Sequence, residues 1–341
     1  MSFHRATGVL VSVKPIDEID AKILTDLFID GRKNFQEIAT DVGVSKNAIS
    51  KHYEAMRKAK VILGSTTQIN YQHLGYSAIA EICIIDYFKD IGKIQEELRK
   101  IPEILVSFFD PVKSTLYAIA TLRQINDLRK LKGIMMDIAG SGRIRTYFWG
   151  GRILNTPEHL SSLQLLRKNE IKAFDEEKLP QVKSSEKENY DQIDIQIIDR
   201  LSINGRIPFK RIADEIGVTT DTVARRYRKL KSNGTIRVTI QIDPRKIGYQ
   251  GTLDSIIHLK SQNNAGSAIS ALSRIPDVFC IVETHQGDAD LHVWTLVKDI
   301  NHLLMIQDQI SQIPDFGKMD SKVTRAFMDI YPSSSQNTSI Y

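Results

Sequence analysis

The chain has 341 residues, of which 42% are hydrophobic and 26% are charged, and its formal net charge is +5. This length suggests two or three domains, and the ordinary composition excludes a largely disordered chain. The apolar runs are far shorter than the roughly 20 residues of a membrane helix, and residues 8–13 lack the cleavage pattern of a signal peptide. We therefore expect a cytoplasmic protein with no membrane partner.

The sequence repeats itself at an offset of 174 residues. Residues 19–62 align with residues 193–236 without a gap, and after a one-residue slip the similarity continues to Ile101-Pro102 and Ile275-Pro276. A repeat of about 135 residues is too long for a solenoid. It indicates a duplicated two-domain unit.

Each copy begins with three short helices. In the first copy, apolar residues at helical spacing predict helices over 16–30 and 35–41, and Ser45 is a suitable N-cap for a third helix. The second copy repeats this pattern with Thr219 as the cap. Two helices, a tight turn that contains glycine, and a capped third helix are typical of a helix-turn-helix.

Positive charge gathers on the third helix of each copy. Five of the six Asp, Glu, Lys and Arg residues between 45 and 60 are basic, as are six of the seven between 219 and 237. Such concentrated charge is typical of a polyanion-binding protein, and in this motif the third helix enters the major groove of DNA. The residues predicted to contact DNA, with the caps and two flanking residues included, are Ser45, Lys46, Asn47, Ser50, Lys51, His52, Thr219, Thr220, Asp221, Arg225 and Arg226.

Strand-like residues follow each third helix, at 61–70 and 235–243. We expect each copy to form a two-stranded wing there that could lie along DNA phosphates. Asn233-Gly234 is a suitable turn for the second wing, whereas the first copy has Ala59-Lys60 at that position.

The remainder of each copy predicts four strands and two helices. In the first copy the strands fall at 77–86, 103–109, 115–122 and 143–148, with helices at 90–100 and 124–138, and residues 251–330 repeat this order. The βαββαβ order is that of the ferredoxin-like fold. The fold class is therefore α+β, a tandem duplication of a winged helix-turn-helix and a ferredoxin-like domain.

The predicted domains are two winged helix-turn-helix domains and two ferredoxin-like domains with a linker between the copies. Their ranges are 14–72, 73–150, 151–189 (linker), 190–246, 247–332 and 333–341 (flexible tail). Residues 157–174 have the apolar spacing of an amphipathic linker helix. The chain has no phosphate-binding loop and no cluster of metal ligands, and Cys83 and Cys280 lie in apolar stretches typical of buried thiols. We expect no cofactor and no metal.

This architecture resembles that of the leucine-responsive and asparagine-operon regulator (Lrp/AsnC) family. The motifs that carry the resemblance are Ile19-Asp20, Gly31-Arg32, Ile38-Ala39, Gly43-Val44-Ser45 and Leu74-Gly75, with counterparts in the second copy. The resemblance covers about 290 residues. It implies a DNA-binding winged head, a RAM/AsnC-type ferredoxin-like domain that dimerises, and an amino acid or similar effector bound between such domains.

The resemblance also implies where the effector binds. The family carries a Gly-x-x-Asp-like turn between the second and third strands, and the second copy has Gly287, Asp288 and Asp290 there, preceded by Thr284. The first copy has no glycine at this turn, so we expect sensing mainly in the second copy. A plain hairpin turn without a ligand is the alternative interpretation.

Three functions remain open at this stage. The preferred one is a sequence-specific DNA-binding transcriptional regulator that is not an enzyme. Siroheme decarboxylases resemble the same fold and also occur as fused pairs, but the resemblance leads us to expect a Trp-Pro-Tyr-Asn-like run, and Trp149 is followed by Gly150. A sensor or adaptor that no longer binds DNA is the third.

The duplication also leaves the pairing of domains open. One chain could supply both halves of a pseudo-dimer, or domains of different chains could pair as a homo-oligomer. Because the two third helices differ in sequence, we expect an asymmetric binding site on double-stranded DNA.

Overall fold

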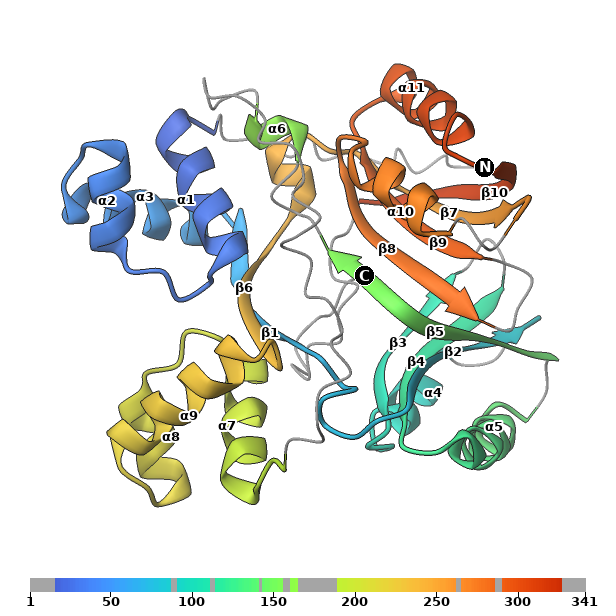
Figure 1. Ribbon diagram of the computed structural model, residues 1–341, viewed down its shortest axis with the longest axis horizontal. Coiled ribbons are helices and arrows are strands. Elements are labelled where there is room, and N and C mark those ends of the chain that lie inside the picture. Colours follow the sequence, from blue (N-terminus) through green and yellow to red (C-terminus); the bar gives the residue numbers. More distant parts are fainter. Residues whose placement is uncertain are drawn as a thin grey trace, which may run out of the picture.

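The computed structural model describes residues 16–86, 91–110, 114–140, 143–155, 160–164, 189–261, 265–285 and 290–326. Two helical domains, here called the first and second head, lie on one side of the molecule (Figure 1). Two sheet-and-helix domains, called the first and second body, lie on the other side. Within these ranges, no helix combines the length and apolar character needed to span a bilayer. The predicted tail at 333–341 lies outside the described residues.

The predicted helix-turn-helix domains are confirmed. The heads are built from α1 (Glu18–Ile29), α2 (Phe35–Val42) and α3 (Lys46–Lys58), and from α7 (Gln192–Ile203), α8 (Phe209–Ile216) and α9 (Thr220–Ser232). A glycine with positive φ ends the middle helix of each head, Gly43 at 75° and Gly217 at 72°. Glycine adopts this left-handed conformation without steric cost, which lets the third helix begin within a few residues.

The expected wings are wrong. Each copy contributes one strand, β1 (Ile62–Ile69) or β6 (Ile236–Ile242), and the two strands pair with each other in an antiparallel sheet, here called the ribbon. Asn233-Gly234 joins α9 to β6 instead of closing a hairpin. An alternating sequence predicts a strand but not its partner, so the pattern fits an inter-copy ribbon as well as a wing. The ribbon lies between the two heads (Figure 1).

Both bodies have the predicted ferredoxin-like order. The first body contains β2 (Ala78–Ile85), α4 (Ile91–Leu98), β3 (Ile104–Asp110), β4 (Thr115–Leu122), α5 (Ile125–Ala139) and β5 (Arg143–Asn155). After a short 3₁₀ helix, η3 (Pro244–Ile247), the second body contains β7 (Gly251–Leu259), α10 (Ala265–Ser273), β8 (Val278–His285), β9 (Leu291–Val297), α11 (Ile300–Ser311) and β10 (Phe316–Arg325). Together the strands form one eight-stranded sheet in the order β10-β7-β9-β8-β5-β2-β4-β3.

The sheet is continuous because β5 has two partners. It pairs with β2 along its first half and with β8 from Phe148 to Asn155, with a register shift between Gly150 and Ile153. The strand therefore continues past its predicted end at 148, to Asn155. Pairing with the other copy is invisible in the sequence of one copy. The structure shows the bodies paired within one chain.

Each body has its own apolar core between its helices and one face of its sheet. In the first body this core includes Ile82, Leu98 and Met135, and in the second body it includes Ile257 and Ile306. Burial of one such side chain contributes about 1.5–3 kcal/mol relative to exposure. The opposite, helix-free face of this sheet carries further residues through which the two bodies meet, such as Glu81 and His292.

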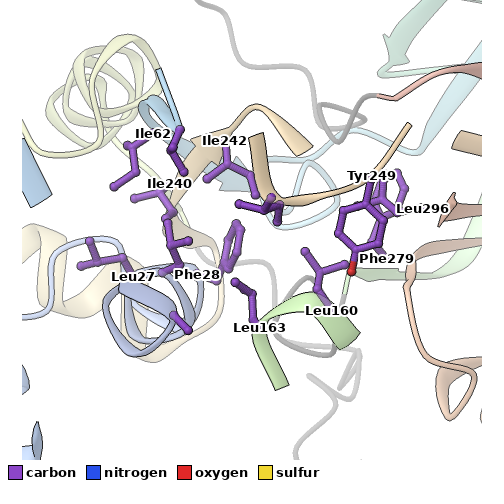
Figure 2. Close-up of a cluster of buried hydrophobic side chains, with 14 of the residues drawn as sticks. Leu27, Phe28, Ile62, Leu160, Leu163, Ile240, Ile242, Tyr249, Phe279 and Leu296 are labelled. Carbon is purple, nitrogen blue, oxygen red and sulfur yellow. The ribbon is translucent and has the colours of Figure 1, made fainter. Parts of the chain in front are cut away.

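Part of the linker connects the first head to the second body. Of the predicted amphipathic helix at 157–174, the structure describes a single turn, α6 (Ser161–Gln164), and residues 165–188 lie outside the described residues. Leu160 and Leu163 are fully buried between Phe28 of α1 and the second body (Figure 2). The buried carboxylate of Asp277 accepts hydrogen bonds from the Ser161 backbone N–H and hydroxyl, both at 2.6 Å. The predicted linker therefore includes a packed structural element.

Candidate nucleic-acid interface

The third helices, α3 and α9, begin in the same way. The Ser45 hydroxyl accepts a hydrogen bond from the Ala48 N–H at 3.2 Å, and the Thr219 hydroxyl accepts one from the Thr222 N–H at 3.2 Å. These caps satisfy N–H groups that a helix start leaves without intrahelical partners. They fix where each helix begins and therefore which side chains face outward.

Most of the predicted DNA-binding residues are exposed on these two helices. Ser50 is half-buried, and His52 and Arg226 are discussed below. The exposed residues are Ser45, Lys46, Asn47, Lys51, Thr219, Thr220, Asp221 and Arg225. Further along the same helices Arg57, Lys58, Arg228 and Lys229 are exposed as well. Each head therefore presents a basic helix to solvent.

His52 and Arg226 face inward, toward the first helix of their own head. The His52 Nδ1 lies 2.8 Å from an oxygen of the buried Asp20 carboxylate. Arg226 forms ion pairs with Asp194 at 3.0 Å and with Asp191 at 2.8 Å. In each head, this side chain attaches the third helix to the N-terminus of the first helix. The structure therefore gives these two predicted DNA-contacting residues a positioning role.

The same contact supplies the one candidate metal-ligand trio found among the described residues. Ligand atoms of Asp17, Asp20 and His52 all lie within 4.8 Å of one another. In the second head a guanidinium takes the place of the imidazole beside the two carboxylates. This equivalence favours an internal hydrogen bond between two helices as the role of the trio.

An exchange of arginines joins the two heads. Arg32 of the first head donates to the backbone oxygens of Gly205 and Ile207 at 2.7 and 2.9 Å, and its guanidinium lies 4.1 Å from the centroid of the Phe209 ring. Arg206 of the second head donates to the Gly31 oxygen at 2.5 Å and lies over the Phe35 ring in return. Burial lowers the pKa of both arginines. Both remain cations, because the ordinary pKa of arginine is so high.

Gly31 and Gly205 allow the heads to approach the ribbon closely. The Gly31 N–H donates to the Val238 oxygen at 2.8 Å, and the Gly205 N–H donates to the Ser65 oxygen at 3.1 Å. A Cβ atom on Gly31 would lie 2.8 Å from the Thr239 backbone nitrogen, and one on Gly205 would lie 2.8 Å from a backbone oxygen of Thr66. The Gly31-Arg32 and Gly205-Arg206 motifs thus set the position of α3 relative to α9.

The predicted effector site is only partly described. Thr284 and Asp290 lie at the two ends of the hairpin between β8 and β9, where the Thr284 N–H donates to the Asp290 backbone oxygen at 2.9 Å. The Asp290 carboxylate accepts the Leu259 N–H at 2.7 Å. Gly287 and Asp288 lie outside the described residues. The structure thus gives Asp290 a role in holding the hairpin against β7.

Sequence reasoning missed a group of charged residues where the two bodies meet, here called the seam. The seam consists of Glu81 and Asp110 from the first body and Asp254, His292 and Lys322 from the second. Single charged residues inside apolar strand patterns were the available signal, since Glu81 and Asp254 each interrupt an apolar stretch. Charges buried in this way require partners.

The seam charges support one another. Burial would lower the pKa of His292, but the carboxylates of Asp254 and Glu81 outweigh it and raise the pKa to about 9. Burial likewise opposes the charge of Lys322, yet Asp254 and Asp110 raise its pKa. The two cations in turn lower the pKa of Asp254 in spite of its burial. At neutral pH both His292 and Lys322 are therefore positively charged. The cysteines are buried and unpaired, as predicted.

Comparison with known proteins matches both heads and the whole fold. The model of the AsnC-type helix-turn-helix domain matches residues 16–57 and 191–231. The chain is 32% identical over 125 residues to the HTH-type transcriptional regulator FL11 of Pyrococcus horikoshii, which is 36% of this chain and 82% of that protein. It is 29% identical over 117 residues to the regulatory protein AsnC of Haemophilus influenzae, 34% of this chain and 78% of that protein.

One solved structure is similar over nearly the entire chain. It is the crystal structure of the siroheme decarboxylase NirDL, with a TM-score of 0.57, 13% identity, and coverage of 90% of this chain and 91% of that chain. At this identity the likeness shows a shared fold alone. The tandem arrangement of heads and bodies therefore has a precedent in a solved protein.

Proposed function

Because the chain belongs to the Lrp/AsnC family, as two units fused in tandem, we propose that it is a transcriptional regulator that binds specific double-stranded DNA with both heads. The observation that carries the proposal is the pair of capped, exposed, basic third helices held in one arrangement by the ribbon and the exchanged arginines. Basic side chains at the start of such helices meet phosphates and base edges in the major groove.

The two half-sites should differ in sequence. At its exposed positions, α3 of the first head offers Lys46, Asn47 and Lys51, and α9 of the second head offers Asp221 and Arg225. Asparagine pairs with adenine, arginine and lysine pair with guanine, and aspartate accepts from cytosine. One chain would thus occupy an asymmetric site whose halves lie one or more helical turns apart.

Footprinting on genomic DNA tests this proposal with two variants of the full chain. Lys46→Ala/Lys51→Ala should weaken protection of one half-site, and Arg225→Ala/Arg228→Ala that of the other, by about tenfold or more. Arg129→Ala/Lys130→Ala is the matched control, since it removes two exposed positive charges from α5 of the first body. Wild-type footprints for both head variants, or an equal loss for the control, would overturn the proposal.

We propose further that an amino-acid-like effector acts through the β8–β9 hairpin of the second body. The hairpin supports this idea because its base is held in place, by the Thr284–Asp290 backbone bond and by the bond from the Leu259 N–H to the Asp290 carboxylate. Asp288→Ala should reduce the response of DNA binding to amino acids supplied singly at millimolar concentration. DNA affinity without amino acids should stay at the wild-type value, and a loss of both together would contradict the assignment.

A binding protein, as opposed to an enzyme, is the role that we propose for the fold. The likeness to a siroheme decarboxylase favours one alternative, catalysis on a tetrapyrrole by this same architecture. The seam supports the non-catalytic role, because its titratable groups pair with one another. Incubation of the purified chain with siroheme separates the two: release of carbon dioxide would establish the enzyme, and an unchanged absorption spectrum would agree with the regulator.

A further inference from the structure

The seam joins the bodies through contacts that only one of the two copies can supply. From the second body, Lys322 lies 2.7 Å from an oxygen of Asp110 and 3.3 Å from an oxygen of Asp254. His292 lies 2.5 Å from Asp254 within its own body and 3.5 Å from Glu81 of the first body. Every cation in these pairs comes from the second body, and two of the three carboxylates come from the first.

Strand register shows what stands at the position of Lys322 in the first body. Lys322 lies opposite Asp254 in the β10–β7 pair, and Tyr147 lies opposite Glu81 in the matching β5–β2 pair. Tyr147 is therefore the counterpart of Lys322. In the same way Thr284 of β8 is the counterpart of Asp110, since Asp110 lies opposite Thr115 and Thr284 bonds to Asp290, the residues directly before Leu116 and Leu291.

The position of His292 is also a tyrosine in the first body. The pairs of Ala78 with Leu122 and of Gly251 with Val297 mark the same point in the two bodies. Five residues before Leu122 stands Tyr117, and five residues before Val297 stands His292. The first body thus keeps both carboxylates and has tyrosines at both cation positions.

We infer that a first body pairs with a second body and not with another first body, because only the unlike pair brings cations to the buried carboxylates of the seam. A pair of first bodies would bury four carboxylates at these positions with neither of the seam cations, His292 and Lys322, beside them. A pair of second bodies would bury four cations with two carboxylates, whereas the unlike pair buries two cations with three carboxylates. Uncompensated buried charge is strongly destabilising.

Neighbouring charges do not remove this difference. Arg145 of β5 acts on Cys83 and Tyr147, but its side chain is exposed to solvent. The indole N–H of Trp149 donates to Glu81 at 3.2 Å, which is one neutral hydrogen bond to a carboxylate. Neither group supplies a buried cation to the first body. The pairing rule goes beyond DNA binding, and it ensures that every pair of bodies carries one head of each kind.

The test gives the second body of the full chain the seam residues of a first body, so that two like surfaces must pair. His292→Tyr/Lys322→Tyr gives the second body the residues of the first body at both cation positions. A matched control is His258→Tyr/Lys318→Tyr, which changes the same residue types on the same body, where their described contacts are with Asp320 of that body. Hydrogen exchange is followed on the β5–β8 ladder and on the β2–β4 and β7–β9 ladders.

We expect the β5–β8 ladder of the seam variant to exchange at least about tenfold faster at neutral pH, while the ladders within each body and the control keep wild-type protection. Adding Glu81→Gln/Asp110→Asn/Asp254→Asn should restore the β5–β8 ladder, because all three carboxylates that lost their cations are then replaced by neutral amides. Wild-type protection in the seam variant would overturn the inference. Failure of the added substitutions to restore protection would overturn it as well. This second outcome decides the matter even if the seam variant alone does not fold.

Discussion

The two junctions of the molecule have diverged to different degrees. Where the heads meet, the contacts are nearly the same in both directions, with Arg32 and Arg206 exchanged across the junction. Where the bodies meet, the two directions differ, because Lys322 reaches Asp110 while their counterparts are Tyr147 and Thr284. After the duplication, the interface between the heads kept an approximate two-fold symmetry, whereas the interface between the bodies became different in its two directions.

The difference follows from what each junction has to do. In the function proposed above, the two third helices reach two major-groove segments of one duplex, and a two-fold relation between them matches the geometry of DNA. The bodies need only remain together, so their seam is free to change as long as its buried charges stay compensated. The junction that sets geometry is conserved between the copies, and the junction that sets pairing is not.

Removing Lys322 should lower the stability of the protein more than any other substitution considered below. Lys322→Met leaves the carboxylates of Asp110 and Asp254 buried without this cation and should lower the free energy of unfolding by about 3–5 kcal/mol. Urea denaturation measures the change. Lys318→Met on the same strand, with a side chain 69% exposed, should change it by less than about 0.5 kcal/mol. Equal effects of the two variants would show that the seam contributes no specific stability.

The pH dependence of stability should report on the same seam. The pKa of His292 in the folded protein, about 9, lies above the ordinary value of 6.5. The stabilisation is therefore complete below about pH 6.5 and is lost as the pH rises through about 9, by about 3 kcal/mol in total. Thermal unfolding of wild type and His292→Gln measures it. A slope in this pH range that the substitution leaves unchanged would assign the titration to another group.

A methyl group at the head junction should have a smaller effect. The Cβ of Gly31→Ala would lie 2.8 Å from the Thr239 backbone nitrogen, so the variant should be destabilised by about 2 kcal/mol. Gly133→Ala on α5 is the control: nothing lies within 4 Å of its Cβ, and the change should stabilise the helix by up to about 1 kcal/mol. Both values come from denaturant unfolding, and loss of stability in the control alone would contradict the close approach.

Exchanging His52 and Arg226, which attach the third helix of each head to its first helix, should have the smallest effect on stability. Arg226 pairs with two carboxylates of α7 and its N-cap, whereas His52 hydrogen-bonds to Asp20. Arg226→His should therefore lower stability by about 1 kcal/mol, and His52→Arg should raise it by a similar or smaller amount. Thermal unfolding of the single and double variants checks both signs. If both substitutions destabilise equally, the two heads use this contact differently from the account given above.

Local signals in the sequence predicted local structure, and pairing over long distance escaped them. Ser45 and Thr219 cap their helices as predicted, because a cap depends only on the next three residues. The wings were wrong because the partner of β1 lies in the other copy. Helical phase predicted His52 and Arg226 beside the DNA-binding surface, because phase alone does not show that both contact the first helix of their own head. The seam was missed because each charge finds its partner only after the bodies pair.

Selection of bound sequences from a random pool of duplex DNA tests the central claim most directly. Wild-type chain should enrich an asymmetric site whose two halves differ. Lys46→Ala/Lys51→Ala should relax the sequence preference of one half, and Arg225→Ala/Arg228→Ala that of the other. Enrichment of perfect palindromes alone, or of no sequence at all, would contradict a tandem regulator with two unlike heads.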